Sequence, residues 1–423
     1  MTDPAVPAFT VTTRAATLPE RIVATAEDSA VWARGDEVLV ASGVALRLDF
    51  SGPERMTRAA TAWQQLLGLA RVDDAVGVVG SGLVAFGTFA FADDSAAAST
   101  LIVPRRIRGR RSGVSFVTEI VGGPAVAAAG PPRVPSVSVA AMDERGYRDA
   151  VAEAVRRIRR GELQKVVLAR DLVAAPPPGF DLTAALRLLR RRYREAWTFA
   201  VDGFFGASPE TLIATDGTSV TARVLAGTAA RETDPVADDR ARAALEASAK
   251  NRVEHSLAVD SLVMALAPSV RDLTVHRRFA LELPNVWHLA TDIAAGLVTD
   301  GAALDLVAAL HPTAAVAGVP RAVAIDAIAE LEPFDRGRYA GPVGWVGAHG
   351  AGEWAVGLRG AQVGPDGTVR AFAGAGIVAD SEPATEYAET GWKFAPVREA
   401  LGRGDVGLRP EAVLRPVPDR APV

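Results

Sequence analysis

The feature that most constrains the fold is a set of short apolar runs joined by tight-turn sequences. Asp216-Gly217 stands between two apolar arms, and Pro365-Asp366-Gly367 separates residues 353–362 from residues 369–378. Turn sequences of this kind between apolar arms are typical of β-hairpins, which pair antiparallel strands. Helical patterns also occur, but they do not alternate regularly with single strands as in a βαβ chain. The pattern therefore predicts an α+β (α/β) chain with antiparallel sheets.

The texture of the chain changes near residue 140. Residues 1–140 are strand-rich, with one helical stretch over 56–69, and they end in a loop rich in Gly, Ala and Pro over 122–135. From residue 141, apolar residues recur at helical spacing up to Gly161, and a strand follows over 164–173. Further on we expect one strand over 198–205, one helix over 238–266, and a last helix that begins at Ser381 and bends or ends at Pro396. We expect a catalytic region over 141–402 and a loose tail over 403–423.

Composition excludes several classes of protein. The chain has no cysteine, which rules out disulfides, thiolate catalysis and cysteine-ligated metal sites. Its net charge of −4 gives no electrostatic reason to expect nucleic acid as a partner. No run of 18 apolar residues predicts a membrane span, and the N-terminal residues lack a basic and then apolar signal. We therefore expect a cytoplasmic protein with no membrane association.

Lysine usage singles out three positions. Of 46 basic residues 43 are Arg, and the three lysines are Lys165, Lys250 and Lys393. Arginine does not give up its proton in proteins, whereas a desolvated lysine can. A lysine that persists in such a chain therefore marks a place where arginine cannot serve, unless the three remain by chance.

Two of these lysines share helix faces with carboxylates. Glu386, Glu389 and Lys393 lie at positions i, i+3 and i+7 of the last helix. Lys250 and Glu254 lie at positions i and i+4 of the helix predicted over 238–266. One reading is a pair of solvated Glu–Lys stripes. The other is a set of carboxylates that binds one hard cation, for which oxygen ligands favour Mg²⁺.

Glycines and one arginine suggest an anion site. Gly374 and Gly376 end one strand and Gly227-Thr228 ends another, so the main chain there can approach a ligand closely. The run GAGIV lacks the third glycine of a dinucleotide fingerprint. Arg359 lies on a strand nearby in sequence and could bind a carboxylate with two hydrogen bonds, although it could equally be a surface arginine.

Lys165 and Glu210 suggest acid–base chemistry. Lys165 lies within a strand, where it is either a snorkelling side chain or a desolvated amine that acts as a base. Glu210 follows a strand in an apolar stretch, where it is either an exposed carboxylate or a protonated acid. A base and an acid beside a Mg²⁺ site would suit addition of water coupled to loss of hydroxide.

Ten strings in order carry a family resemblance: KVVLAR, FGASPETL, LAGT, SAKNRVEH, VWHLATDI, LHPTAAVAGVP, RGRYAGPVGW, GEWAVGLRGA, AGAGIV and EPATEYAETGWK. Together they resemble the chorismate-utilising enzymes, which include isochorismate, salicylate, anthranilate and aminodeoxychorismate synthases. The resemblance spans residues 140–400. It implies a single domain of two large, mostly antiparallel sheets with helices outside, in which the N-terminal third belongs to the same fold. It also implies Mg²⁺ and chorismate as substrate.

The resemblance implies a role for each site residue. Lys165 corresponds to the lysine that activates water for attack at C2, and Glu210 to the acid that protonates the departing C4 hydroxyl. Glu254, Glu386 and Glu389 match the Mg²⁺ carboxylates. The positions that surround the substrate correspond to Gly227, Thr228, Lys250, His288, Ala315, Tyr339, Arg359, Gly374, Gly376 and Lys393.

Two residues distinguish among the members. Ala315 stands at a position where isochorismate synthases resemble one another in having Ala. The amine-using and salicylate-forming members tend to carry Thr there. Lys165 favours water as nucleophile, and a fused amidotransferase would need a cysteine. We therefore predict an isochorismate synthase that needs no amidotransferase partner and acts as a monomer. Asn251 departs from the family, because many relatives carry an acid there, which weakens this position as a metal ligand.

Alternatives stay open at this point. A salicylate synthase would go on to eliminate pyruvate, and an anthranilate or aminodeoxychorismate synthase component would depend on ammonium. A catalytically dead regulatory or scaffold subunit would bind neither Mg²⁺ nor chorismate. The sequence does not decide between menaquinone and siderophore biosynthesis.

Overall fold

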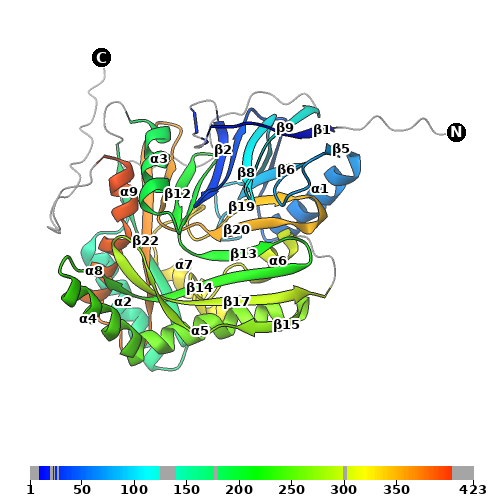
Figure 1. Ribbon diagram of the computed structural model, residues 1–423. Helices are drawn as coiled ribbons and strands as arrows, with labels where there is room; N and C mark the ends of the chain where they lie inside the picture. Colours follow the sequence, from blue (N-terminus) through cyan, green and yellow to red (C-terminus); the bar gives the residue numbers. More distant parts are fainter. Residues whose placement is uncertain are drawn as a thin grey trace, which may run out of the picture.

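The computed structural model describes residues 9–402 except 20–21, 23, 26–27, 124–139, 176–179 and 299–302. Two large sheets and surrounding helices form a single domain (Figure 1). This agrees with the predicted α+β architecture. The predicted boundary near residue 140 and the predicted tail over 403–423 fall largely on residues outside those described.

Within the described residues, the larger sheet has twelve strands, and only its β1–β5 pair is parallel. Its spatial order is β18 (Gly318–Val319), β10 (Lys165–Ala174), β22 (Val369–Ile377), β21 (Gly360–Val363), β12 (Phe204–Ser208), β11 (Trp197–Val201), β2 (Asp28–Arg34), β3 (Glu37–Ser42), β8 (Arg106–Arg111), β9 (Val114–Gly122), β1 (Phe9–Ala15) and β5 (Ala70–Asp74).

The second sheet has ten strands in the described part of the chain. Its order is β15 (Val270–Val275), β17 (Val286–Leu297), β14 (Ser219–Ala230), β13 (Thr211–Thr215), β20 (Gly352–Val356), β19 (Pro342–Gly347), β6 (Val84–Thr88), β7 (Ser99–Val103) and β4 (Leu46–Phe50), with β16 (Phe279–Glu282) paired to β17.

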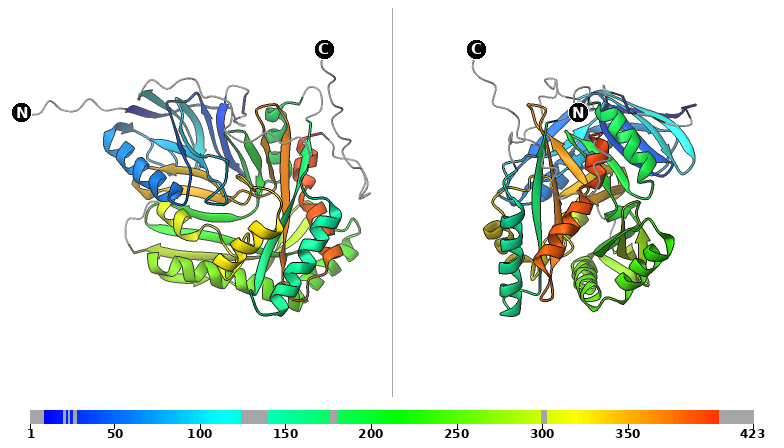
Figure 2. Two further views of the ribbon diagram at one scale, coloured as in Figure 1. Left: turned by 180° about the vertical axis from the view of Figure 1, so that it is seen from behind. Right: turned by 90° about the vertical axis from the view of Figure 1, so that its left-hand side faces the viewer.

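Helices cover the outer faces of both sheets (Figure 2). They are α1 (Arg55–Leu69), α2 (Glu144–Arg159), α3 (Leu182–Arg192), α4 (Pro235–Ala247), α5 (Ala249–Leu266), α6 (Ala303–Leu310), α7 (Arg321–Leu331), α8 (Pro383–Lys393) and α9 (Ala395–Ala400), with short 3₁₀ turns at Ala267–Ser269 and Ala348–Gly350. Helix α8 packs on β22 and α2, and α5 packs on β14. Among the described residues no helix is long and apolar enough to cross a membrane.

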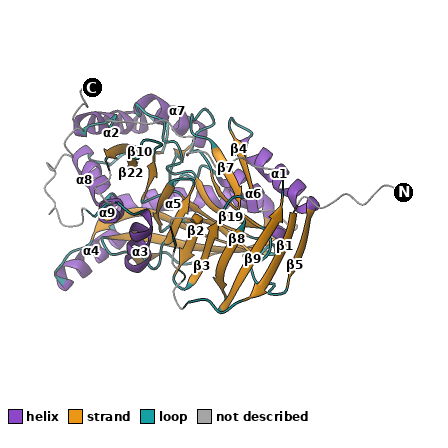
Figure 3. Ribbon diagram, turned by 90° about the horizontal axis from the view of Figure 1, so that it is seen from above, coloured by secondary structure: helices purple, strands orange, loops and turns teal. Residues whose placement is uncertain are grey.

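The two sheets meet over an aromatic core at one end of the molecule. Figure 3 shows the N-terminal strands gathered there, away from β10, β22 and the helices α2 and α8. Trp32 and Trp197 stack at this end with ring centroids 4.8 Å apart, and both are almost completely buried. Stacked aromatics bury a large apolar area in a defined geometry. This region is therefore well suited to hold the sheets at a constant separation.

Three elements differ from the sequence-based prediction. The predicted strand over 198–205 is a hairpin of β11 and β12 that turns at Asp202-Gly203, where both φ angles are positive. The predicted helix over 238–266 breaks at Ser248, whose side chain caps α5 at the Asn251 N–H. Residues 353–362 do not form one strand, because the chain leaves the second sheet after Val356 and joins the first at Gly360. Two of these breaks carry a local signal that the prediction missed, because Asp-Gly favours a hairpin turn and Ser favours a helix N-cap.

Candidate active site

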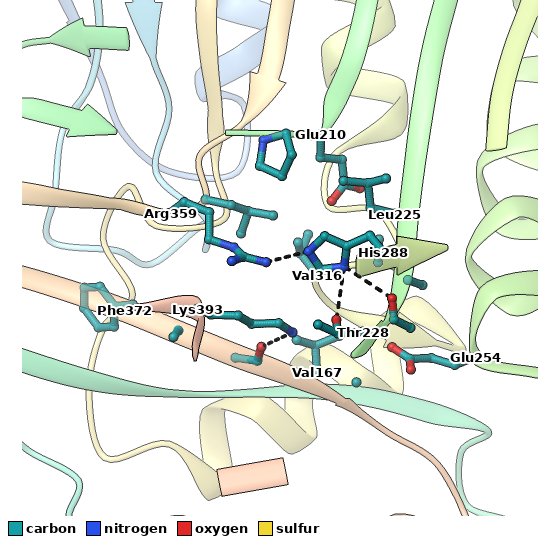
Figure 4. Close-up of a pocket in the computed structure, with 18 of the residues that line it drawn as sticks. Val167, Glu210, Leu225, Thr228, Glu254, His288, Val316, Arg359, Phe372 and Lys393 are labelled. Atoms are coloured by element: carbon teal, nitrogen blue, oxygen red, sulfur yellow. Dashed lines mark hydrogen bonds between the residues drawn. The ribbon is translucent and has the colours of Figure 1, made fainter. Parts of the chain in front are cut away.

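A pocket of about 590 Å³ opens where the two sheets diverge, and most of the predicted site residues line it. From the predicted set these are Glu210, Gly227, Thr228, Glu254, His288, Ala315, Tyr339, Arg359, Gly374, Gly376 and Lys393. Strands and helices distant in sequence thus bring these side chains into one cavity (Figure 4).

Two neighbouring crossings between the sheets supply Glu210 and Arg359. Glu210 lies between β12 of the first sheet and β13 of the second, and Arg359 lies between β20 and β21, which cross the other way. The crossings are hydrogen bonded, from Ala207 N to the Arg359 carbonyl at 3.2 Å and from Val356 N to the Glu210 carbonyl at 3.1 Å. Arg359 has a φ of +53°, which is uncommon for a residue other than glycine and marks a constrained position.

Arg359 and His288 form the polar wall of the pocket. Arg359 Nη2 lies 2.6 Å from His288 Nε2, and burial, reinforced by the Arg359 charge, holds the pKa of His288 well below its usual range. The neutral imidazole therefore accepts this bond at Nε2 and carries its proton on Nδ1, which lies 3.2 Å from the Gly227 carbonyl. Burial also lowers the pKa of Arg359 to about 10. Arg359 Nη1 is buried with no hydrogen-bond partner among the described residues, so it is free to bind an anion.

A bulge in β14 brings Thr228 opposite His288. The pairing of β14 with β17 shifts between Leu225 and Thr228, and Gly227 there has a φ of +85°. Bulges re-aim the side chains that follow them. Thr228 Oγ1 accordingly lies 3.1 Å from His288 Nδ1 at the pocket wall.

Glu210 is a buried carboxyl without a side-chain hydrogen bond among the described residues. Burial raises its pKa to about 8, and the positive charges of Lys165, Lys393 and Arg359 only partly oppose this effect. At neutral pH the carboxyl is therefore protonated and can donate a proton.

Lys165 lies immediately behind the pocket lining, at the start of β10. Its side chain is completely buried, its Nζ has no hydrogen-bond partner among the described residues, and Glu254 Oε1 is 3.5 Å away. Both side chains pack against Gly376. A Cβ at that position would lie 2.0 Å from Glu254 Oε1 and 3.1 Å from Lys165 Cε. Only glycine leaves room for both side chains.

Each lysine is matched to one carboxylate. Lys250 is paired with Glu386, Lys393 Nζ lies 2.6 Å from Glu389 Oε1, and Lys393 also donates to the Gly374 carbonyl at 2.8 Å. Burial, reinforced by Glu389, raises the pKa of Glu386. Burial opposes the charge of Lys250, but Glu386 outweighs it and raises the pKa of that ammonium. The residues that line the pocket do not include Lys250, Glu386 or Glu389, which lie beside it.

These carboxylates suit a hard divalent cation. Glu386, Glu389 and Glu254 all act electrostatically on the Lys250 ammonium, which marks a place where positive charge is stabilised. Mg²⁺ commonly binds through one or two carboxylates, several waters and a substrate anion. Among the described residues no group of three or more His, Cys, Asp or Glu side chains is arranged to hold a metal by itself. The donor chemistry fits Mg²⁺ with water and substrate completing the shell.

Sequence reasoning missed the apolar part of the wall. It is formed by Val167, Pro209, Leu225, Ala226, Val316, Leu358, Phe372 and Ala373. Phe372 stacks on Tyr339 with centroids 5.2 Å apart, which gives the cavity a flat aromatic side. Apolar residues in strands look the same whether they face a core or a cavity, so no local signal distinguishes them.

Comparison with known proteins identifies the family of the chain. A model of the family described as chorismate binding enzyme matches residues 126–402. The isochorismate synthase DhbC of Bacillus subtilis is 39% identical over 269 residues, which cover 60% of this chain and 67% of DhbC.

Two solved structures share the fold. MenF, the menaquinone-specific isochorismate synthase of Escherichia coli, superimposes with a TM-score of 0.75 at 27% identity, over 94% of this chain and 96% of that one. Anthranilate synthase component I of Streptococcus pneumoniae gives 0.65 at 20% identity, over 91% and 94%. Because the second enzyme shares the architecture as well, the fold alone does not select the reaction.

Proposed function

The chain belongs to the chorismate-binding enzyme family, and from this premise we propose that it is an isochorismate synthase that interconverts chorismate and isochorismate. One observation carries the assignment of the reaction. Glu210 lines the cavity with a buried, protonated carboxyl, and Lys165 lies behind the lining with its Nζ buried and without a hydrogen-bond partner among the described residues. This is the acid and base that addition of water with loss of a hydroxyl requires.

The proposed reaction assigns the proton transfers to these two groups. Lys165 accepts a proton from water as the water oxygen bonds to C2 of the ring. The ring double bonds shift, the C4–O bond breaks, and Glu210 donates its proton so that the hydroxyl leaves as water. The reverse reaction uses the same groups with their roles exchanged.

Other residues hold the substrate. Arg359 binds one carboxylate with its free Nη1, and the neutral His288 keeps that guanidinium in place. Tyr339 and Phe372 form the apolar side against which the ring rests. Glu254, Glu386 and Glu389 would hold Mg²⁺, which when bound would neutralise a substrate carboxylate.

A product assay tests the proposal. Purified protein is incubated with chorismate and Mg²⁺, with and without ammonium, and the products are separated by chromatography. We expect a chorismate–isochorismate mixture that reaches the same ratio from either side, without pyruvate and without dependence on ammonium. Pyruvate with salicylate would overturn the assignment in favour of a salicylate synthase. An amino product that forms only with ammonium would overturn the role of Lys165.

A further inference from the structure

Glu332 and Arg336 form a buried ion pair, and neither residue lines the pocket of the candidate site. Glu332 follows α7, and Arg336 lies in the loop that leads to Tyr339. Both are more than nine-tenths buried. The pair is two-pronged: Arg336 Nε lies 2.8 Å from Glu332 Oε2, and Arg336 Nη2 lies 2.5 Å from Glu332 Oε1. Neither residue has a role in the proposed reaction.

The pair completes the edge of the first sheet. Strand β18 pairs with β10 only at Lys165 and Val166, so the edge of β10 beyond them has no neighbouring strand. Arg336 Nη2 donates to the Val167 carbonyl at 2.7 Å, and Glu332 Oε1 accepts from the Ala169 N–H at 2.7 Å. Two charged side chains thus supply the hydrogen bonds that a strand would otherwise make.

The same guanidinium reaches two further walls of the pocket. Arg336 Nη1 donates to the Val316 carbonyl at 2.9 Å, one residue beyond Ala315. The main-chain carbonyl of Arg336 accepts a hydrogen bond from the Tyr339 N–H at 3.0 Å, and the Arg336 guanidinium lies 5.9 Å from the Tyr339 ring centroid. Val167, Val316 and Tyr339 all line the cavity. One side chain therefore sets the relative positions of three of its walls.

The position of Lys165 depends on this support. Lys165 and Val167 lie two residues apart on β10, so they face the same side of the strand. No hydrogen bond among the described residues fixes Lys165 Nζ, and its Glu254 neighbour is 3.5 Å away. The position of the amine therefore depends on the course of β10 and on the packing around the buried side chain.

We propose that Glu332 and Arg336 are positioning residues for the reaction, holding β10 and the segment around Val316 so that Lys165 faces the bound substrate. The inference rests on the proposed function. Displacing a reacting group by about 1 Å can cost about 10²-fold in rate. Lysine at position 336 would keep the charge but lose the planar fork that binds two carbonyls and a carboxylate at once.

The experiment compares R336K with a matched control, R111K. Arg111 is also buried and also forms a two-pronged pair, with Glu353, but it lies in the aromatic core and does not line the pocket. Isochorismate formation is measured over a range of chorismate concentrations, and thermal unfolding gives the folded fraction of each protein. We expect R336K to lose at least tenfold in kcat, with KM changed by less than threefold, and R111K to keep its kcat within about twofold.

Equal kcat losses in the two variants at equal folded fraction would overturn the proposal, since the pair would then be only structural. E332Q, which keeps an acceptor for the Ala169 N–H, gives the same test if R336K does not fold, with the same expected loss in kcat. Wild-type turnover reports separately on the proposed function. The wild-type product identifies the reaction, and the ratio of the variants to wild type tests the positioning role.

Discussion

Two buried glutamates, one at each end of the molecule, differ in the hydrogen-bond partners of their carboxyl groups. Glu353, in the aromatic core, accepts hydrogen bonds from Trp32 Nε1 at 2.9 Å and Trp345 Nε1 at 3.1 Å, and Arg111 forms an ion pair with it. Glu210, at the pocket, has no side-chain hydrogen bond among the described residues, and burial raises its pKa to about 8. The first carboxylate is fully partnered, and the second is left to change its protonation state.

The contrast extends to the neighbouring cations. Arg111 is bound on two sides in the core, whereas Lys165 Nζ and Arg359 Nη1 are buried without hydrogen-bond partners in the described structure. Unpaired buried polar groups are costly, and they persist in native proteins mainly where function needs them. At the pocket end, the buried groups without partners are therefore charged groups that can act on a substrate.

The largest effect that this comparison predicts is on turnover at the pocket. Lys165→Ala and Glu210→Gln should each lower kcat by about 10²–10⁴-fold, the usual contribution of a general acid or base. Both variants should remain folded, because neither side chain forms a hydrogen bond among the described residues, and Lys165→Ala removes only the 3.5 Å contact with Glu254. Steady-state rates and circular dichroism measure the two properties. Near-full isochorismate formation by either variant would contradict the assignment.

At the other end of the molecule the same kind of change should act on stability. Glu353→Ala leaves Arg111 and two indole N–H groups buried without their acceptor, and breaking a buried pair typically costs about 3–5 kcal/mol. We expect urea unfolding to show a loss of that order, while kcat of the folded protein stays within about twofold. A large loss of kcat with unchanged stability would erase the distinction between the two regions.

The pH dependence of the two glutamates sharpens the comparison. The pKa of Glu210 is raised from 4.5 to about 8, so the folded state binds a proton more tightly than the unfolded state. Its contribution to stability is then present below about pH 4.5 and is lost as pH rises towards 8. Glu210→Gln, which cannot ionise, should therefore gain in Tm relative to wild type as pH increases, with the gain levelling off above about pH 8.

Thermal unfolding between pH 4 and pH 9 measures this difference, and Glu353→Gln is the matched control. Wild-type kcat/KM should also decline above about pH 8, because Glu210 then loses the proton that it donates. A Tm difference for Glu210→Gln that does not vary with pH would show that the carboxyl is not protonated in the folded protein.

A smaller effect is expected at the close contact beside Glu254. In Gly376→Ala the new Cβ would lie 2.0 Å from Glu254 Oε1, so the carboxylate must move. Displacing a metal-binding carboxylate or its support typically weakens metal affinity about 10-fold or more. Titration of activity with Mg²⁺ measures the change. Gly391→Ala on α8, where a Cβ meets no atom within 4 Å, should leave the titration unchanged.

Much of the fold was predictable because its signals are local. The Asp216-Gly217 turn, the helix that ends before Gly161 and the start of α8 near Pro383 follow from turn and capping chemistry, and the structure confirms them. The prediction missed the break at Ser248, although its side chain forms a local N-cap with the Asn251 N–H. It also missed the switch between sheets at Arg359, which depends on β20 and β21 pairing with strands of different sheets.

Some residues of the candidate site carried a signal in the sequence, and others did not. The three lysines, the Glu–Lys spacings and the ordered motifs predicted a set of candidate site residues, and most of that set lines one cavity. The apolar walls and the Glu332–Arg336 pair carried no such signal. Glu332 and Arg336 are i and i+4 neighbours, so in sequence they look like an ordinary surface pair.

By itself, then, the sequence determined which residue types are available for acid, base and metal chemistry, and it determined the order of hairpins and helices. The tertiary structure decided which of these groups lose their water and which find partners. Glu210 and Glu353 cannot be told apart as residues in a sequence. Their difference comes from desolvation and hydrogen bonding, which depend on strands and helices brought together from distant parts of the chain.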